Sequence, residues 1–371
     1  MDNFSSLPPS AQQAILYGPA ATPPAGVRPN FDNPPHNNGL GIGVISACLA
    51  VSMLCVSVWI YSRVFCMKRI RIEDALGFAA FGFYAGLAWV GFSYASVVGF
   101  WVQQYNVQVI TMSKVSYILY INAIVYLFGM MLLKIAIMLE WLHIFVPRRT
   151  LNKTFFWVSC TMITLNIMYY AAAIVSVQFY CIPREKIWDR WLPGQCLDRK
   201  SLDTSTGCFN VLFDIILLLM PQRVIWKLQL STKRKLGISF VFSMGLLACI
   251  CAAGRIYSVA TLRYESNVSY DASAAYLWGI AEFTCALMVF CVPCFPMVVG
   301  DASRFAKYVS VKSRSGFSHR SAPKSSLPDP TSASDKSKTA FSRRNDYDAL
   351  SDDAASQKVP LTTIRTARIR S

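Results

Sequence analysis

Seven long apolar stretches constrain the fold of this chain more than any other feature of its sequence. A helix needs about 20 apolar residues to cross the roughly 30 Å hydrocarbon core of a bilayer, and its backbone polar groups must be bonded within the segment. The stretches, each long enough for one crossing, are approximately 40–64, 75–100, 118–142, 155–179, 204–226, 236–262 and 273–299. We therefore expect an all-α membrane protein, a seven-transmembrane helix bundle embedded in a lipid bilayer.

The chain divides into three parts around these stretches. Residues 1–38 are rich in Pro and Asn and lack the apolar core of a signal peptide, so we expect a disordered N-terminal tail and insertion directed by the first span. Residues 39–300 form the predicted membrane domain. Residues 301–371 are rich in Ser, Lys, Arg and Asp, a composition that buries too little apolar surface to fold. We expect a disordered basic tail there.

Basic residues in the connecting loops predict the orientation, because Lys and Arg are enriched on the cytoplasmic side of membrane proteins. They follow the first, third and fifth spans: Lys68, Arg69, Arg71, Arg148, Arg149, Lys153, Lys227, Lys233, Arg234 and Lys235. This places the N-terminus outside and the C-terminal tail in the cytoplasm. The fourth loop opposes the assignment, since it also carries basic residues between Arg184 and Lys200. The length of the spans favours the plasma membrane over thinner internal membranes.

The composition argues against several classes of function. The net charge of +16 arises beside the spans and in the tail, which is typical of loops facing anionic lipid and not of a nucleic-acid-binding face. No nucleophile elbow, phosphate-binding Gly loop or metal-ligand spacing is found, so we expect no enzyme activity, no cofactor and no metal. A retinal-binding chain holds its chromophore on a lysine of the last span, and 273–299 contains none.

Ionisable residues inside the spans are the strongest functional signal, because each costs several kcal/mol if it faces lipid. Asp214, Arg255 and Glu282 lie in the outer halves of the last three spans, and Asn210 lies one turn from Asp214 on the same helix face. If these helices pack together, Arg255 pairs with Glu282 or with Asp214. Lys134 in the third span joins the set. The cluster has two interpretations, a polar clasp between helices and a ligand pocket open to the outside.

The third span carries further polar residues near its predicted inner end. Glu140, Trp141 and His143 are interpreted as interface residues whose polar ends reach the headgroups. For Lys134 two placements stay open, because its long side chain can either extend to the interface or pair inside the bundle.

The fourth loop and the sequons supply candidate sites on the predicted outer side. Cys181 and Cys196 flank a polar connector in an oxidising compartment, so we predict a disulfide, which would stabilise the fold by about 3 kcal/mol. Between them lie Trp188, Trp191 and Pro193, which are interpreted as an aromatic lid over the bundle or as anchors at the interface. Asn3 and Asn267 each begin a candidate glycosylation sequon.

A set of short motifs spread over about residues 40–300 resembles the fungal rhodopsin-like domain family, which is related to fungal pathogenesis-type G-protein-coupled receptors. The motifs are Arg71-Ile72-Glu73-Asp74, Lys134-Ile135-Ala136, His143-Ile144-Phe145, Cys181-Ile182-Pro183, Trp188-Asp189, Gly194-Gln195-Cys196, Asn210-Val211-Leu212-Phe213-Asp214, Met220-Pro221, Leu228-Gln229-Leu230, Lys233-Arg234-Lys235-Leu236-Gly237, Arg255-Ile256 and Trp278-Gly279-Ile280-Ala281-Glu282. The chain departs from the usual pattern at Glu140-Trp141-Leu142 and at Glu73-Asp74. The resemblance implies the fold and membrane residence more firmly than signalling.

Three hypotheses follow for the function. The first is a receptor-like membrane protein that senses an extracellular small molecule other than retinal near Asn210, Asp214, Arg255 and Glu282, with a cytoplasmic signalling protein as its partner. The second is a small-molecule transporter or channel, in which the same charges line a solute path. The third is a membrane scaffold that acts through its cytoplasmic tail.

Overall fold

The computed structural model describes residues 8–67, 70–146, 153–189, 192–225, 232–261 and 267–294. These ranges contain seven helices long and apolar enough to cross a membrane, which confirms the predicted fold class. The spans are α2 (Asn38–Tyr61), α3 (Ile72–Val97), α4 (Val109–Phe145), α5 (Lys153–Gln178), α6 (Arg199–Ile225), α7 (Thr232–Thr261) and α8 (Val268–Cys291).

Some helices begin earlier than the apolar windows predict, because hydropathy marks the hydrocarbon core and not the end of the helix. The α4 helix starts at Val109, well before the window that opens at Ile118, since no Gly or Pro interrupts the intervening residues. The α3 helix starts at Ile72, where the Asp74 side chain accepts a hydrogen bond of 2.8 Å from the Arg71 N–H. A carboxylate in this position satisfies a backbone donor that the helix itself leaves free.

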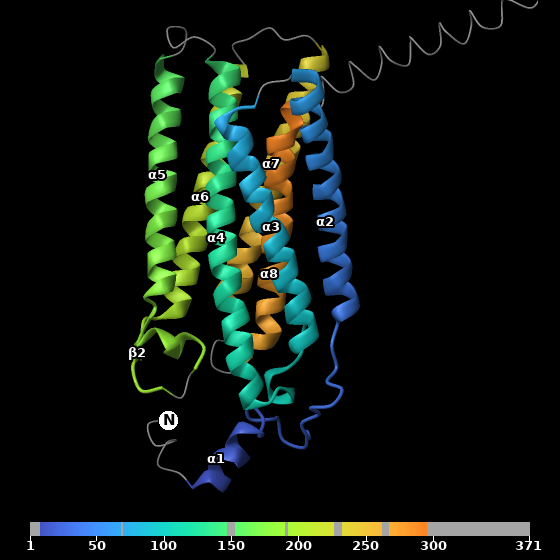
Figure 1. Cartoon of the computed structure of the whole chain (residues 1–371), viewed down its shortest axis with the longest axis vertical. Coiled ribbons are helices and arrows are strands. Elements are labelled where there is room, and N and C mark those ends of the chain that lie inside the picture. The colour runs from blue at the N-terminus through green and yellow to red at the C-terminus, as the bar shows by residue number, and fades with distance from the viewer. Residues whose placement is uncertain are drawn as a thin grey trace, which may run out of the picture. The chain divides into compact units, whose positions relative to one another are not determined.

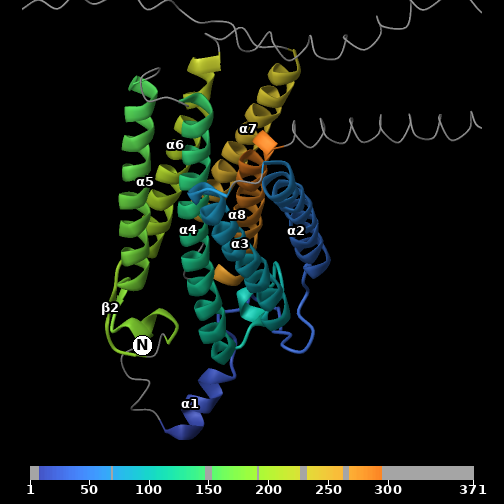
Figure 2. The same cartoon turned by 45° about the horizontal axis from the view of Figure 1, so that its top comes forward.

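The helices run side by side (Figures 1 and 2), and α4 and α8 are the most buried of the seven. Tyr84 of α3, Met130 of α4 and Phe283 of α8 have no side-chain exposure and meet in the main hydrophobic core. On the outward faces large apolar side chains stay exposed, among them Leu54, Trp89, Trp157 and Met168. Such a surface suits hydrocarbon as its solvent, because a helix that is apolar all round must be covered by protein or by lipid.

Glycines allow close helix contacts at the centre of the bundle. Gly129 of α4 lies against Phe283 of α8, and Gly254 of α7 lies against Trp278 of α8. Small residues at such crossings are typical of membrane bundles, in which van der Waals packing drives helix association.

The N-terminal segment has a defined structure, so the prediction of a disordered tail is wrong for residues 8–37. After the short helix α1 (Pro9–Leu16), the segment hydrogen bonds to the chain between α3 and α4: Ala20 N to Val107 O at 2.8 Å, Asn30 N to Asn106 Oδ1 at 3.0 Å, and Asn37 N to Phe100 O at 2.9 Å. Residues 1–7 and 301–371 lie outside the described residues, and the prediction for them stays a prediction.

The connector between α5 and α6 forms a small antiparallel pair, β1 (Cys181–Ile182) and β2 (Gln195–Cys196). A disulfide joins Cys181 to Cys196 across this pair. Trp188 packs on Tyr117 and Tyr120 of α4, with ring centroids 5.7 and 5.8 Å apart, while Trp191 lies outside the described residues. The pair and α1 lie at the same end of the bundle, which we call the loop end (Figure 1).

We predict that Gly129→Ala destabilises the bundle, whereas Gly82→Ala on α3 does not. A Cβ at position 129 would lie 2.6 Å from Phe283 Cε2 and 2.9 Å from Phe83 Cβ, whereas a Cβ at position 82 meets nothing within 4 Å. Overpacking of this kind costs about 1–3 kcal/mol. Thermal unfolding midpoints of both purified variants in one detergent check this, and equal midpoints would contradict it.

Candidate functional site

A buried polar cluster connects five helices at the middle of the bundle. It contains the five residues singled out from the sequence together with two tyrosines, and we call it the central cluster: Tyr126, Lys134, Tyr170, Asn210, Asp214, Arg255 and Glu282. The structure therefore brings all five predicted residues together. The Lys134 and Glu282 side chains are 1% and 0% exposed, and the Arg255 side chain, at 14%, is the most exposed of the four charged ones.

The first half of the central cluster is the ion pair between α4 and α6. Lys134 Nζ lies 2.7 Å from Asp214 Oδ1 and also donates to Asn210 Oδ1 at 2.8 Å. The Tyr170 hydroxyl of α5 donates to the same Asn210 oxygen at 2.6 Å. Lys134 therefore pairs inside the bundle, and the alternative placement at the membrane interface is wrong.

The second half is the ion pair between α7 and α8. Arg255 Nε lies 3.1 Å from Glu282 Oε2, which decides between the two partners that the sequence left open. The Tyr126 hydroxyl donates to Glu282 Oε1 at 2.8 Å, and the Arg255 guanidinium lies over the Tyr126 ring, 4.9 Å from its centroid. A cation over an aromatic face gains a further attraction when it is shielded from water.

Asn210 joins the two ion pairs into one network. Its Nδ2 donates to Glu282 Oε1 and to Asp214 Oδ2, the latter at 3.4 Å, while its oxygen accepts from Lys134 and Tyr170. An amide side chain has two donors and two acceptor positions, so Asn210 uses its full capacity. With two cations and two carboxylates, the central cluster carries no formal net charge.

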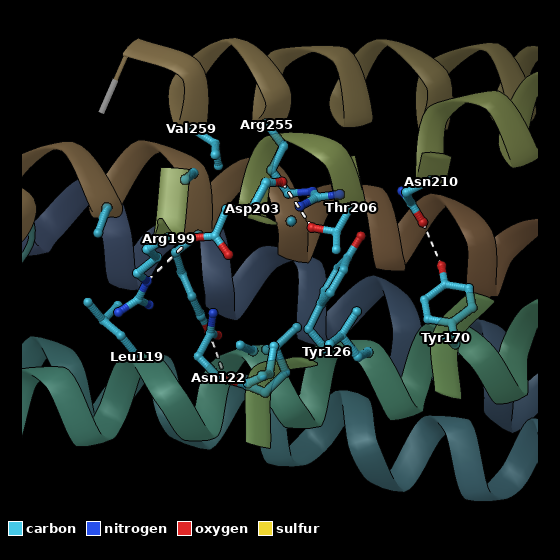
Figure 3. A pocket seen from close by; sticks show the side chains of 18 of the residues that line it. Leu119, Asn122, Tyr126, Tyr170, Arg199, Asp203, Thr206, Asn210, Arg255 and Val259 are labelled. Carbon is cyan, nitrogen blue, oxygen red and sulfur yellow. Dashed lines mark hydrogen bonds and ion pairs between the residues drawn. The ribbon is translucent and has the colours of Figure 1, made fainter. Parts of the chain in front are cut away.

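A cavity of about 140 Å³ lies between the central cluster and the loop end. Figure 3 shows Asn210 and Tyr170 at one side of it, with Arg255 projecting into it from α7. Its walls are mainly apolar and aromatic: Leu87, Leu119, Ala123, Tyr126, Leu127, Tyr169, Val177, Val259, Val268, Ala272, Ala275, Tyr276 and Gly279. A concave, mostly apolar site with a few convergent polar groups is the usual form of a small-molecule site.

The first turn of α6 adds two charged residues to the cavity wall. Arg199 Nε lies 3.4 Å from Asp203 Oδ2, one helical turn away. Asp198 caps this turn: its carboxylate accepts from the Ser201 hydroxyl and from the Lys200 and Ser201 N–H groups. The Ser201 hydroxyl bond in particular lowers the pKa of Asp198 below its ordinary value. The cap fixes where α6 begins and therefore where Arg199 and Asp203 lie.

A second ionic network, which the sequence did not predict, lies at the end of the bundle opposite the loop end. In this end cluster Arg63 Nε lies 2.9 Å from Asp74 Oδ1, and Arg63 Nη2 lies 2.5 Å from Glu140 Oε1, with all three side chains buried. Glu73 lies 3.2 Å from His143 Nδ1. Glu140 is therefore not an interface residue as predicted, because its carboxylate pairs inside the protein. The sequence does contain a signal for the pair between Arg63 and Glu140: the two residues lie at matching depths in the first and third predicted spans.

Asn267 does not fit the predicted glycosylation site. Its side chain is buried, its Oδ1 accepts from the Gln104 N–H at 3.0 Å, and its Nδ2 donates to Gln103 Oε1 at 2.6 Å. The nitrogen that would carry the glycan is thus already engaged in the contact that joins α8 to the loop before α4. Asn3, the other predicted site, lies outside the described residues.

These features define a class: a seven-helix membrane protein with paired charges in its transmembrane core and a small cavity beside them. Residues 58–300, more than half of the chain, match the fungal rhodopsin domain, and the chain belongs to this family.

Curated relatives agree with this family. "Fugralins biosynthesis cluster protein 2" of Gibberella zeae is 35% identical over 288 residues, which cover 77% of this chain and 72% of the relative. "SAT4 family membrane protein" of Emericella nidulans is 31% identical over 193 residues, or 52% and 48% of the two chains. "Receptor GIN3" of Arthrobotrys oligospora is 25% identical over 315 residues, or 84% and 74%. No solved structure matches the chain significantly. The chain is thus a multi-pass membrane protein of receptor-like architecture.

We predict that Lys134→Met is strongly destabilising and that the double variant with Asp214→Leu recovers most of the loss. The single change leaves a buried carboxylate without its cation, which costs about 3–5 kcal/mol, whereas removal of both charges leaves an apolar contact. Arg199→Met is the control, because its partly exposed pair with Asp203 is worth less than about 1 kcal/mol. Thermal unfolding of the four proteins tests this, and a double variant no more stable than the single one would refute it.

For the end cluster, we expect Arg63→Met to lower stability more than Glu140→Gln does. The first change leaves two buried carboxylates without a guanidinium, whereas the second leaves the pair between Arg63 and Asp74 intact. Unfolding midpoints in the same detergent measure the difference. Equal losses would mean that Arg63 does not hold both carboxylates.

Proposed function

We propose that the chain is a receptor that detects a small molecule, other than retinal, through the cavity beside the central cluster, and that it acts without catalysis. The observation that carries the proposal is the double role of Arg255. Its side chain lines the cavity and is also the cation of the ion pair with Glu282 that joins α7 to α8. A molecule that contacts Arg255 therefore acts directly on a contact between two helices.

The loop end is proposed to face the outside of the cell. The disulfide between Cys181 and Cys196 lies at this end, and disulfides persist in oxidising compartments. The same orientation follows from the basic residues after the first, third and fifth spans. It opens the cavity toward the extracellular side and places the end cluster near the cytoplasm, where a signalling protein would bind. The plasma membrane is the proposed location.

The transmission of a signal is proposed to depend on differential affinity. A ligand shifts an equilibrium between two arrangements of the bundle only if it binds one of them better. The Arg255 side chain is shared between the ligand and Glu282. A ligand at Arg255 therefore has different affinities for two arrangements of the bundle that differ in the spacing between α7 and α8. The relative named as a receptor supports this type of function for the family.

We predict that Ala275→Phe abolishes stabilisation by small molecules that stabilise the unaltered protein. Ala275 lines the cavity, so the larger ring fills space that a ligand needs. Ala50→Phe on the exposed side of α2 is the matched control. The measurement is the thermal shift of the full chain in nanodiscs with each compound of a small-molecule library. A ligand at 100 times its Kd raises the free energy of unfolding by about 2.7 kcal/mol.

Two outcomes would contradict the receptor. Compounds that stabilise the Ala275→Phe variant as well as the unaltered protein would move the site elsewhere. Flux of an active compound across proteoliposomes that contain the purified chain would replace the receptor with a transporter.

A further inference from the structure

The size of the cavity restricts what it can hold. An engineered apolar cavity of about 150 Å³ binds benzene, and pockets for drug-sized ligands measure about 300–1,000 Å³. A cavity of about 140 Å³ therefore suits a molecule with one ring and a few further atoms. The mainly apolar and aromatic walls suit the ring itself.

The charges around the cavity restrict the charge of the ligand. Arg255 is paired with Glu282, and Arg199 is paired with Asp203. Behind the wall, Lys134 balances Asp214. Because these charges cancel in pairs, a charged ligand would bring an uncompensated charge into a site with mainly apolar walls, and such a charge is unfavourable. The ligand that fits is uncharged.

Most polar groups of the wall are already engaged within the protein. The tyrosine hydroxyls donate to protein oxygens: Tyr126 to Glu282, Tyr169 to Thr206 O, Tyr170 to Asn210, and Tyr276 to Leu87 O. Asn210 has no capacity left. These groups shape the cavity but have little to offer to a ligand.

Two of the remaining wall groups lie beside the aromatic part of the cavity and are complementary in kind. Asn122 Oδ1 is buried and has no hydrogen-bond partner among the described residues, although a buried acceptor normally has one. Arg255 uses its Nε for Glu282, and within the described ranges no partner is found for its two terminal nitrogens. Figure 3 shows Asn122 on α4 and Arg255 on α7 at opposite sides of the cavity.

We propose that the cavity binds an uncharged single-ring molecule with a carbonyl oxygen that accepts from Arg255 and an N–H or O–H that donates to Asn122 Oδ1. This inference rests on the proposed function and specifies the chemical class of its ligand. Binding satisfies the unpartnered Asn122 oxygen and leaves the charge balance of the site unchanged.

Four probes of equal size test the class: benzamide, acetophenone, benzoate and benzamidinium. Benzamide is uncharged and has both the acceptor and the donor, acetophenone lacks the donor, and the other two carry a charge. Ligand-observed NMR on the full chain in nanodiscs gives their Kd values. We expect benzamide to bind at least about tenfold more tightly than each of the other three, because each leaves a buried group unpaired or adds a buried charge.

The variant Asn122→Leu tests the donor contact. We expect this variant to weaken the affinity for benzamide to that for acetophenone. The Kd of acetophenone should change by no more than about twofold, because only benzamide loses a hydrogen bond. Asn166→Leu is the matched control, since Asn166 is also a buried asparagine whose side-chain amide has no hydrogen-bond partner in the described part of the chain, but it does not line the cavity. It should leave both affinities unchanged.

The outcomes separate this inference from the receptor proposal. Benzoate or benzamidinium binding as tightly as benzamide, a benzamide affinity independent of Asn122, or no binding by any probe would overturn the ligand class. Probe binding that persists in the Ala275→Phe variant would instead overturn the cavity as the site. The comparison of the four probes on the unaltered chain stands even if Asn122→Leu folds poorly.

Discussion

The Asn210 side chain makes it possible for this bundle to hold four charges inside a membrane. Each charge of the central cluster would cost several kcal/mol alone in hydrocarbon, and each ion pair still needs further hydrogen bonds to offset desolvation. Asn210 supplies these bonds to both pairs at once, because its amide contacts Lys134, Asp214 and Glu282. The packing of α4, α6 and α8 at the middle of the bundle therefore depends on one uncharged residue.

The α4 helix carries this constraint along the length of the bundle. It contributes Asn122 and Tyr126 to the cavity, Lys134 to the central cluster and Glu140 to the end cluster. At 1.5 Å per residue, roughly 27 Å separates Asn122 from Glu140 along the helix axis. One rigid element thus contacts a cavity near one end and an ionic network at the other. No loop separates the cavity from the end cluster along α4.

The sequence predicted the features that hydropathy and charges well inside the spans mark, and it missed contacts made at the ends of the spans and in the N-terminal segment. The seven spans follow from hydropathy, because a backbone in hydrocarbon has almost no alternative to the helix. Asn210 and Asp214 were placed together correctly because they are one turn apart on α6. Arg63 was missed because it lies at the edge of the predicted span 40–64, and its partner Glu140 was interpreted as an interface residue. The defined structure of residues 8–37 arises from hydrogen bonds to residues 100–107, which composition does not reveal.

The two interpretations of the central cluster, a clasp between helices and a ligand site, are not alternatives in this geometry. In a cluster that only joined helices, every charged group could face its own partner. Arg255 instead pairs with Glu282 and also lines an adjacent cavity. A cavity without a clasp would bind a molecule with no consequence for the helices. Because one guanidinium belongs to both, any molecule that hydrogen bonds to it changes the electrostatic environment of a pair that joins α7 to α8. Under the proposed function, the stability of the fold and the response to a ligand would therefore be properties of the same contact.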